Sequence, residues 1–196
     1  DSFFAEVVDP MIREAKAKGL NVTCEVTPHH FSLTDDAVRS FNTNTKMAPP
    51  LRSDRHVDAI KAALKDGTID AIATDHAPHT IQDKEVEFEY AANGIIGLET
   101  AFGLGVTVLV EGGVLTLTEL IARLTCNPAR IFHLHKGTLS VGADADVTII
   151  DPNRDWVVDV RKFASKSRNS PFDGWKLRGE VLATIVGGKV VWEREG

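Results

Sequence analysis

The sequence predicts an α/β fold with a parallel sheet, followed by a small β unit. Helix-like and strand-like patterns alternate over residues 1–136, as they do in parallel α/β folds. From Gly137 the pattern changes to short apolar strands separated by Gly, Asp and Pro. Hydrophobic residues make up 43% of the 196-residue chain, which is enough to bury a core. We therefore expect two parts, residues 1–136 and residues 137–196.

The first predicted elements are a helix and a strand. Apolar side chains recur with helical spacing over residues 3–15, and Gly19 is a stop signal. Pro10 either kinks this helix or restarts it, with Asp9 as the N-cap and Pro10 at the first helical position. The stretch "LNVTCEV", residues 20–26, is β-branched and apolar, which predicts a short buried strand. Pro28 is expected to end it, because proline cannot donate to a sheet.

A loop, a helix and a second strand follow. The stretch "FNTNTKMAPPLRS" has no periodicity and two adjacent prolines, so it predicts a loop. Ser53 is expected to cap a helix whose inner face carries Val57, Ile60 and Leu64, with Gly67 as its end. The stretch "TIDAIAT" predicts the next strand.

The middle of the chain predicts a polar loop and then helices. Residues 79–93 are charged and suggest a mobile loop. The stretch "GLETAFGLGVTVLVEG" predicts a long, mostly apolar helix. Shorter helices are expected at "LTLTELIARLT" and "NPARIFHL", the second with Asn127–Pro128 as cap and first turn.

The last part predicts strands in three stretches, "GTLSVGADADVTIIDPN", "WVVD" and "EVLATIVGGKVVWE". The pair Gly187–Gly188 lies between two apolar runs, which is typical of a tight hairpin turn. We interpret these stretches as a small β unit, separate from the α/β part.

Composition and charge exclude some classes of function. The net charge of −6 and the pI of about 5.6 give no basic surface for nucleic acid. No apolar run approaches the roughly 20 residues of a membrane helix. Cys24 and Cys126 are far apart in sequence and predict reduced thiols in a cytoplasmic protein. The chain begins without Met or a targeting segment and leads directly into a helical pattern, so we expect a piece of a longer chain.

The stretch "IATDHAPHT" places titratable side chains directly after a predicted strand. In a parallel α/β barrel such positions face the catalytic mouth. A carboxylate there, Asp75, can bind a metal ion, take a proton from a metal-bound water, or do both. Pro78 would hold His76 and His79 in fixed directions, and His79 could meet an anionic or carbonyl group of a substrate. The alternative is an ordinary helix cap and two surface histidines.

Other candidates are weaker. His29 and His30 are adjacent, and on an extended segment they would point to opposite faces, so at most one could reach the mouth. Arg52 could hold a carboxylate with two hydrogen bonds, or could simply be an exposed residue at a helix start. The remaining histidines lie on or after predicted helices and are expected to be structural or exposed: His56, His133 and His135.

Six stretches in the same order make the sequence resemble one family: "VTCEVTPHHFSLTDD", "TKMAPPLRS", "DGTIDAIATDHAPHT", "GIIGLETAFGL", "NPARIFHL" and "GTLSVGADADVTIIDP". They resemble the C-terminal portion of bacterial dihydroorotases, which belong to the amidohydrolase superfamily. The resemblance covers nearly all 196 residues. "ATDHAPH" followed by "GIIGLET" is more similar to dihydroorotases than to amidohydrolases in general.

The resemblance implies the last strands and helices of a (β/α)8 barrel over residues 1–136. It also implies a composite, urease-like β-sandwich domain with a C-terminal extension over residues 137–196. The implied reaction interconverts N-carbamoyl-L-aspartate and L-dihydroorotate in pyrimidine biosynthesis, with one or two zinc ions. The protein would be a homodimer and could bind aspartate carbamoyltransferase.

The resemblance also implies roles for particular residues. Asp75 would be both a zinc ligand and the general acid/base. His79 would contact the substrate carboxylate, and the loop backbone at Asn93 and Gly94 would bind substrate. The histidines of "TPHH" are not the zinc ligands of the family.

Two departures from the family pattern matter. Ala48 stands where the family has a substrate-binding Asn, and a methyl group cannot replace the hydrogen bonds of an amide. The other zinc ligands of the family are absent and would lie before Asp1, in barrel strands one to six. We therefore expect the isolated chain to be inactive, since catalytic zinc normally has about three protein ligands.

Two alternatives stay open. Ala48 also fits a related cyclic amidase, such as an allantoinase or a dihydropyrimidinase, although allantoinases usually lack the second His of "DHAPH". The other alternative is an inactive dihydroorotase-like subunit that supports aspartate carbamoyltransferase. The presence of both Asp75 and His79 favours the enzyme.

Overall fold

The structure is a computed structural model that describes residues 8–194, and it has a mixed α/β architecture. Its helices are α1 (Asp9–Ala17), α2 (Pro28–Ser32), α3 (Asp54–Lys65), α4 (Ile81–Lys84), α5 (Ala101–Leu104), α6 (Leu117–Leu124) and α7 (Cys126–Ile131). Its strands are β1 (Glu25–Val26), β2 (Ala71–Ile72), β3 (Val147–Val157), β4 (Lys176–Val186) and β5 (Lys189–Glu193). No helix in the described part of the chain is long and apolar enough to span a membrane.

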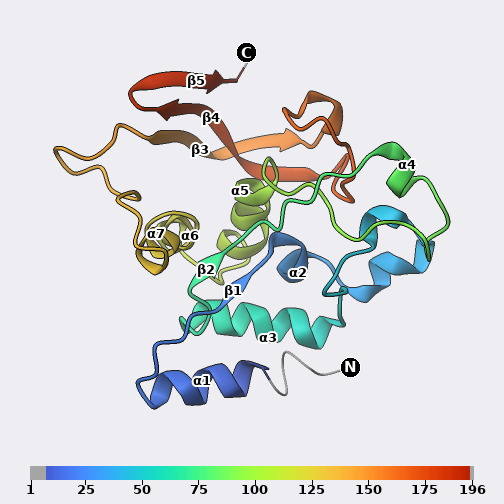
Figure 1. Ribbon diagram of the computed structural model, residues 1–196, viewed down its shortest axis with the longest axis horizontal. Coiled ribbons are helices and arrows are strands. Elements are labelled where there is room, and N and C mark those ends of the chain that lie inside the picture. Colours follow the sequence, from blue (N-terminus) through green and yellow to red (C-terminus); the bar gives the residue numbers. More distant parts are fainter. Residues whose placement is uncertain (1–7, 195–196) are drawn as a thin grey trace.

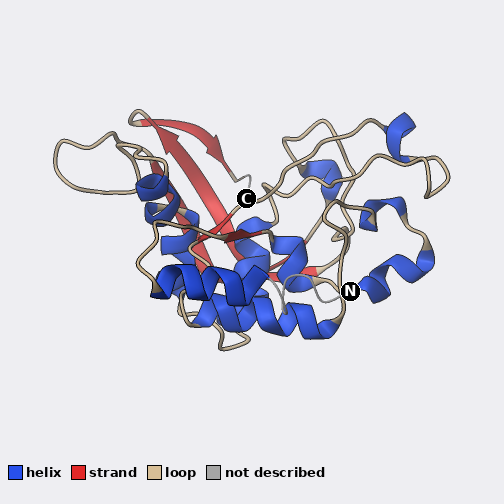
Figure 2. Ribbon diagram, turned by 60° about the horizontal axis from the view of Figure 1, so that its bottom comes forward, coloured by secondary structure: helices blue, strands red, loops and turns tan. Residues whose placement is uncertain are grey.

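The elements are stacked in layers (Figure 1). The antiparallel sheet β3-β4-β5 lies at the top of the view, α5 lies beneath it, and the β1-β2 pair, α3 and α1 follow below. Figure 2 shows the helices gathered mainly on one side of this antiparallel sheet. The loops that follow β1 and β2 extend away from α1 and lead toward α4.

The parallel pair predicted from the sequence is present but short. β1 pairs with β2 in parallel, Glu25 opposite Ala71 and Val26 opposite Ile72. The predicted strand over residues 20–26 is therefore wrong for its first five residues. A strand is defined by its hydrogen-bonded partner, and among the described residues only the end of this segment meets one.

Both predicted helices of the first part are confirmed within the described residues, while the predicted positions 3–7 lie outside them. α1 ends next to Gly19, which has a φ of +73° and so suits the left-handed position after a helix. α3 buries Val57, Ile60 and Leu64 as expected. The N-cap of α1 is Val8 rather than the expected Asp9, which is already the first helical residue.

The segment "TPHH" differs from its prediction. Pro28 does not simply end a strand but begins α2, so His29 and His30 lie on a helical turn. Proline is well suited to a first helical position, because its fixed φ matches the helix and its missing N–H is not needed there. The prediction that the two histidines point to opposite faces of an extended segment is therefore wrong.

The helices of the middle part are confirmed with changes of detail. The predicted long helix is α5 followed by a π-helical turn, Gly105–Val110. α6 has a capping box in which Thr116 and Glu119 satisfy each other's backbone N–H groups. Asn127 is not the cap of α7, which begins at Cys126; its side-chain amide donates instead to the Asp70 carbonyl oxygen at 2.8 Å.

The last part forms one three-stranded antiparallel sheet. The predicted stretch "GTLSVGADADVTIIDPN" is a strand only from Val147 on, so the prediction is wrong for residues 137–146. Its end joins the first two residues of "WVVD" in the single strand β3, which carries register irregularities where it pairs with β4. The Gly187–Gly188 turn between β4 and β5 is confirmed, and both glycines have positive φ values.

The sheet packs closely on α5 and the π-helical turn. Gly103 is the close-approach point: a Cβ there would lie 3.0 Å from the Trp156 ring and 3.2 Å from the Gly179 carbonyl oxygen. Leu104 and Val106 share one buried cluster with Leu177 of β4. Residues 137–196 therefore share a core with the α/β part, although the domain boundary at 136/137 stays a prediction.

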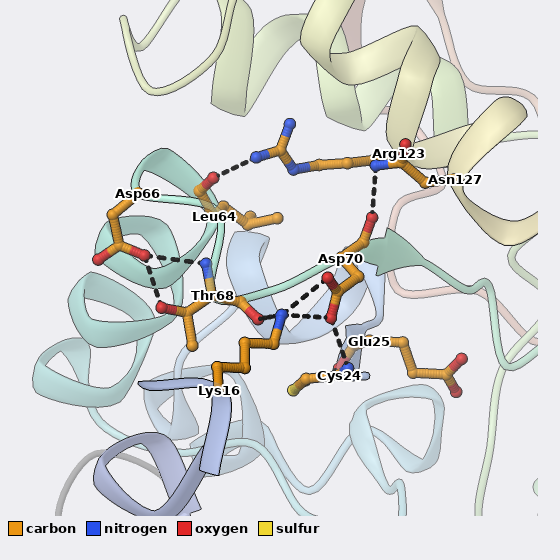
Figure 3. Close-up of polar contacts among 9 residues, drawn as sticks. All are labelled: Lys16, Cys24, Glu25, Leu64, Asp66, Thr68, Asp70, Arg123 and Asn127. Atoms are coloured by element: carbon orange, nitrogen blue, oxygen red, sulfur yellow. Dashed lines mark hydrogen bonds and ion pairs between the residues drawn. The ribbon is translucent and has the colours of Figure 1, made fainter. Parts of the chain in front are cut away.

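A polar network holds the layers together at the amino end of β2 (Figure 3). Lys16 of α1 donates to both carboxylate oxygens of Asp70 at 2.7 Å and to the Thr68 carbonyl oxygen at 2.8 Å. The Cys24 N–H donates to the Asp70 carboxylate at 2.8 Å. Arg123 of α6 donates to the Leu64 carbonyl oxygen at 2.5 Å. The contacts of Asp70 join α1 to the segments that lead into β1 and β2, and the Arg123 contact joins α6 to α3.

We expect Asp70→Ala to destabilise the chain by about 1–3 kcal/mol, because it leaves the Cys24 N–H without its acceptor and the Lys16 ammonium with the Thr68 carbonyl oxygen but without a carboxylate. Urea unfolding followed by circular dichroism measures this loss. Asp58→Ala, on the exposed side of α3, is the matched control. Equal stability of the two variants would contradict the role given to Asp70.

Candidate functional site

Asp75 lies at the opposite end of β2 from the Asp70 network. It follows the strand by three residues, and its side chain is exposed. Its φ of +49° is in the left-handed region, which Asp tolerates better than most residues. Among residues 8–194 no hydrogen bond is made to its carboxylate. The carboxylate is therefore available to a ligand at the carboxyl end of the strand.

His30 links the end of β1 to the loop that carries Ala48. Its Nε2 lies 3.0 Å from the Pro49 carbonyl oxygen, so Nε2 is the donor there. Its Nδ1 lies 2.6 Å from the Thr27 hydroxyl, which donates to it when the ring is neutral. Burial lowers the pKa of His30, whereas the hydrogen bond to Pro49 and the negative charge of Asp75 oppose this shift.

His29 precedes His30 on the same helical turn and is buried. Its Nε2 has no hydrogen-bond partner in the described part of the chain, and burial lowers its pKa to about 3. A side chain of this kind packs as a neutral ring. Its ring centroid lies 4.4 Å from that of His30.

The buried His29 ring makes stability depend on pH. Unfolded histidine titrates near 6.5, so between pH 6.5 and about 3 the unfolded state binds more protons than the folded state. The free energy of unfolding should therefore fall as pH drops below 6.5, with a contribution of up to about 1.4 kcal/mol per pH unit. Urea unfolding at pH 7.5 and pH 5.5 measures it. His29→Leu should have a shallower dependence, and identical slopes would count against this account.

His79, Asn93 and Gly94 meet next to the carboxyl end of β2. The His79 Nε2 donates to the Asn93 carbonyl oxygen at 2.8 Å. Gly94 has a φ of +110°, and a Cβ there would lie 2.6 Å from the Cβ of Ala77 and 3.5 Å from the His79 Nε2. The three positions that the sequence suggested for substrate binding are thus neighbours, although they come from two loops.

The neighbouring loops are joined through their backbones. The Gly94 N–H donates to the Lys46 carbonyl oxygen at 3.0 Å, two residues before Ala48. The Ala77 N–H donates to the Ile95 carbonyl oxygen at 2.8 Å. The Gly97 N–H donates to the His76 Nδ1 at 3.1 Å. His76 therefore holds the loop after Gly94 rather than facing a ligand with this ring nitrogen.

Sequence reasoning missed two residues at this site. Asn169 is buried, accepts a hydrogen bond from the His79 N–H and donates to the Ala77 and Gly94 carbonyl oxygens. Lys84 is also buried and donates to the Ala92 and Gly94 carbonyl oxygens. No motif near position 169 in the sequence indicated that Asn169 would belong to this site. The pattern "TIQD" could have found α4, because Thr80 and Asp83 form a capping box.

The remaining candidates are Arg52 and three histidines. Arg52 is half-buried and its carbonyl oxygen accepts from the Asp35 N–H. His133 and His135 are exposed, and His56 is buried, in agreement with the prediction that all three are structural or exposed.

The side chains at this site do not by themselves fit a zinc site. Within residues 8–194 there is no group of three or more His, Cys, Asp or Glu side chains that could hold a metal ion. Catalytic zinc normally has about three protein ligands. Asp75 can therefore be no more than one ligand of such a site.

Comparison with known proteins gives consistent matches over almost the whole chain. A sequence profile described as the amidohydrolase family matches residues 8–191. The chain is 60% identical over 184 residues to a protein named dihydroorotase from Geobacter metallireducens. It is 56% identical over 185 residues to one from Syntrophus aciditrophicus. Each match covers 94% of this chain and 43% of the relative, so the chain spans less than half of their length.

Solved structures of related enzymes share the fold. An L-hydantoinase (dihydropyrimidinase) from Arthrobacter aurescens superimposes with a TM-score of 0.89 at 36% identity, over 96% of this chain and 43% of that one. A dihydropyrimidinase from Brevibacillus agri gives a TM-score of 0.87 at 26% identity, over 94% of this chain and 42% of that one.

Proposed function

The chain belongs to the amidohydrolase family, and we propose that it acts as the C-terminal part of a longer dihydroorotase. In that protein it would take part in the interconversion of N-carbamoyl-L-aspartate and L-dihydroorotate in pyrimidine biosynthesis. The curated relatives named dihydroorotase support this choice. We use "full-length form" for a protein of the relatives' length that contains this chain, such as a fusion of it to the N-terminal part of one relative.

One arrangement carries the proposal. An exposed carboxylate, Asp75, follows β2, and on the same turn His79 lies against the loop backbone at Asn93 and Gly94. In the proposal, Asp75 would be the acid/base group, His79 the side chain for an anionic substrate group, and the backbone at Asn93 and Gly94 the surface for the ring. These roles suit hydrolysis of a cyclic amide that carries a carboxylate.

In the proposed reaction, the oxygen of an attacking water bonds to the ring carbonyl carbon while Asp75 accepts its proton. Asp75 then gives that proton to the ring nitrogen as the carbon–nitrogen bond breaks. Ring closure is the reverse sequence. His79 would hold the substrate carboxylate, and the backbone at Asn93 and Gly94 would fix the ring. Ala48, opposite this loop, would contribute only contact with its methyl group.

The proposal includes the context in which these residues work. Asp75 would be one ligand of a site for one or two zinc ions, completed by residues in the portion of the relatives that this chain does not cover. The β1-β2 pair would belong to the closing strands of a (β/α)8 barrel, and residues 137–196 to a β-sandwich domain. The amidohydrolase family match and the structural similarity to the L-hydantoinase support the barrel and the β-sandwich domain.

The location and partners are part of the same proposal. Cys24 and Cys126 are free thiols, which supports a cytoplasmic location. A homodimer is proposed, with aspartate carbamoyltransferase as a protein partner of the full-length form. Light scattering of the full-length form, alone and mixed with aspartate carbamoyltransferase, tests both.

A second cyclic amidase activity is the main alternative. The solved structures named hydantoinase and dihydropyrimidinase share the fold, and Ala48 lacks the amide that a dihydroorotase uses for its substrate. An inactive structural subunit is less consistent with the sequence, because it has no need for Asp75 and His79.

Turnover of L-dihydroorotate, dihydrouracil, hydantoin and allantoin by the full-length form separates these alternatives. We expect L-dihydroorotate to have the highest kcat/KM, and the isolated chain to have no activity. A preference for an uncharged ring would favour a hydantoinase or dihydropyrimidinase. No turnover of any cyclic amide by a folded full-length form would favour the structural subunit.

A further inference from the structure

Two buried side chains converge on the carbonyl oxygen of Gly94. Lys84, the last residue of α4, donates from Nζ to this oxygen at 3.1 Å and to the Ala92 carbonyl oxygen at 2.8 Å. Asn169 donates from Nδ2 to the same Gly94 oxygen at 3.2 Å and to the Ala77 carbonyl oxygen at 2.9 Å. Both side chains are only 5% exposed.

Asn169 connects the Gly94 carbonyl oxygen to the segment that carries His79. Its Oδ1 accepts from the His79 N–H at 3.3 Å, and its own carbonyl oxygen accepts from the Ile96 N–H at 3.0 Å. A residue from the C-terminal part of the chain thus fixes the turn that carries His79 and the loop that carries Gly94 relative to each other.

Lys84 is an unusual residue to bury beside backbone carbonyl oxygens. A buried ammonium is costly to desolvate, and among residues 8–194 no carboxylate forms an ion pair with Lys84. Burial, and secondarily the positive charge of Lys46, lower the pKa of Lys84 to about 8, so the side chain is mostly charged at neutral pH. A charged donor makes stronger hydrogen bonds to carbonyl oxygens than a neutral one does. Within the described residues, the buried Lys84 ammonium therefore has two backbone carbonyl oxygens, of Ala92 and Gly94, as its hydrogen-bond acceptors.

We propose that Lys84 is a positioning residue for the substrate, and that it acts by holding the Ala92–Gly94 backbone against Asn169 and His79. The effect of Lys84 on substrate binding rests on the proposed function. The effect of Lys84 on the loop conformation does not rest on it, so the two effects can be tested separately. Lys84 itself does not contact the substrate in this proposal.

The loop-holding role is tested first, in the full-length form without any substrate. Three amides in the loop have hydrogen-bond acceptors in this structure and report on it: those of Gly94, Ile96 and Gly97. Amide hydrogen exchange is compared between the parent, Lys84→Met and the control Lys65→Met, an exposed lysine on α3. We expect exchange of the three amides to be roughly tenfold faster in Lys84→Met only.

Two results would overturn this role. One is unchanged exchange of the three amides in Lys84→Met. The other is equal acceleration of these amides and of buried α3 amides such as those of Ile60 and Leu64, which would mean general destabilisation. If Lys84→Met does not fold, Lys84→Gln replaces it; its shorter, uncharged side chain cannot reach both carbonyl oxygens, and the same acceleration is expected.

The substrate part is then tested in the full-length form. Lys84→Met should raise KM for the preferred cyclic amide about tenfold, with kcat changed less than threefold, because the loop is displaced while Asp75 is untouched. A fall in kcat with KM unchanged would overturn the substrate part. If the parent has no activity toward any cyclic amide, the proposed function fails, and the exchange result for the loop still stands.

Discussion

Asp75→Asn in the full-length form should lower kcat/KM for L-dihydroorotate by on the order of 10²–10⁴-fold, the range that a positioned general acid/base contributes. Asparagine has nearly the same size and keeps one oxygen, but it cannot accept and return a proton at neutral pH. Because the Asp75 carboxylate accepts no hydrogen bond from residues 8–194, the substitution breaks no hydrogen bond within the described part of the chain and removes only its electrostatic interaction with His30. The expected loss is therefore one of chemistry rather than of folding.

Steady-state assays of the parent, Asp75→Asn and the control Asp58→Asn measure this effect. Asp58 is exposed on α3, and its replacement should leave activity unchanged. Thermal unfolding of the three proteins shows whether they are equally folded. Activity of Asp75→Asn within threefold of the parent would remove the acid/base role from this residue.

Gly94→Ala should have the second largest effect. A left-handed residue of this kind costs about 1–3 kcal/mol when it carries a Cβ, and the new methyl group would also lie 2.6 Å from the Cβ of Ala77. The loop must move away from His79 to relieve this contact. We expect KM in the full-length form to rise at least tenfold, since about 1.4 kcal/mol corresponds to a factor of ten.

Gly113→Ala is the matched control for this substitution. Gly113 has a φ of +68°, but a Cβ there would have nothing within 4 Å. It should lose some stability from the backbone conformation and leave KM unchanged. If Gly94→Ala and Gly113→Ala behave alike in both stability and KM, close packing of the loop at Gly94 does not matter for substrate.

The sequence predicted the parts of this fold that depend on local patterns. The inner face of α3, the Gly187–Gly188 hairpin and the turn after β2 all follow from neighbouring residues. The extent of β1 did not follow, because strand length depends on a partner more than 40 residues away. The prediction for "TPHH" was wrong for another reason: Pro28 ends a strand and begins a helix equally well, and periodicity cannot choose between the two.

The same distinction applies to the site. Asp75 and His79 could be found because they follow a strand-like run within a few residues. Asn169 could not, because its side chain contacts residues that lie 75 and 92 positions earlier in the chain. Lys84 was hidden in a charged stretch that suggested a mobile loop, although the Thr80–Asp83 capping box marks a short helix there. A lysine in such a stretch gives no sign of being buried.

The two ends of β2 have different tasks. At the amino end, polar contacts of Asp70 join α1 and α7 to the start of β2. At the carboxyl end, the Asp75 carboxylate receives no such contact from the described residues, while the backbone around it is held by Asn169 and Lys84. In the proposed function the carboxyl end of β2 would be the reactive one, as the carboxyl ends of strands are in barrel enzymes.

A crystal structure of the full-length form with L-dihydroorotate tests the central claim most directly. It should place an Asp75 carboxylate oxygen within about 3 Å of the ring nitrogen or of the attacking oxygen, the reach required of a general acid/base. It should also place His79 against the substrate carboxylate. A bound ligand elsewhere, with the Asp75 side chain directed into bulk solvent, would contradict the account.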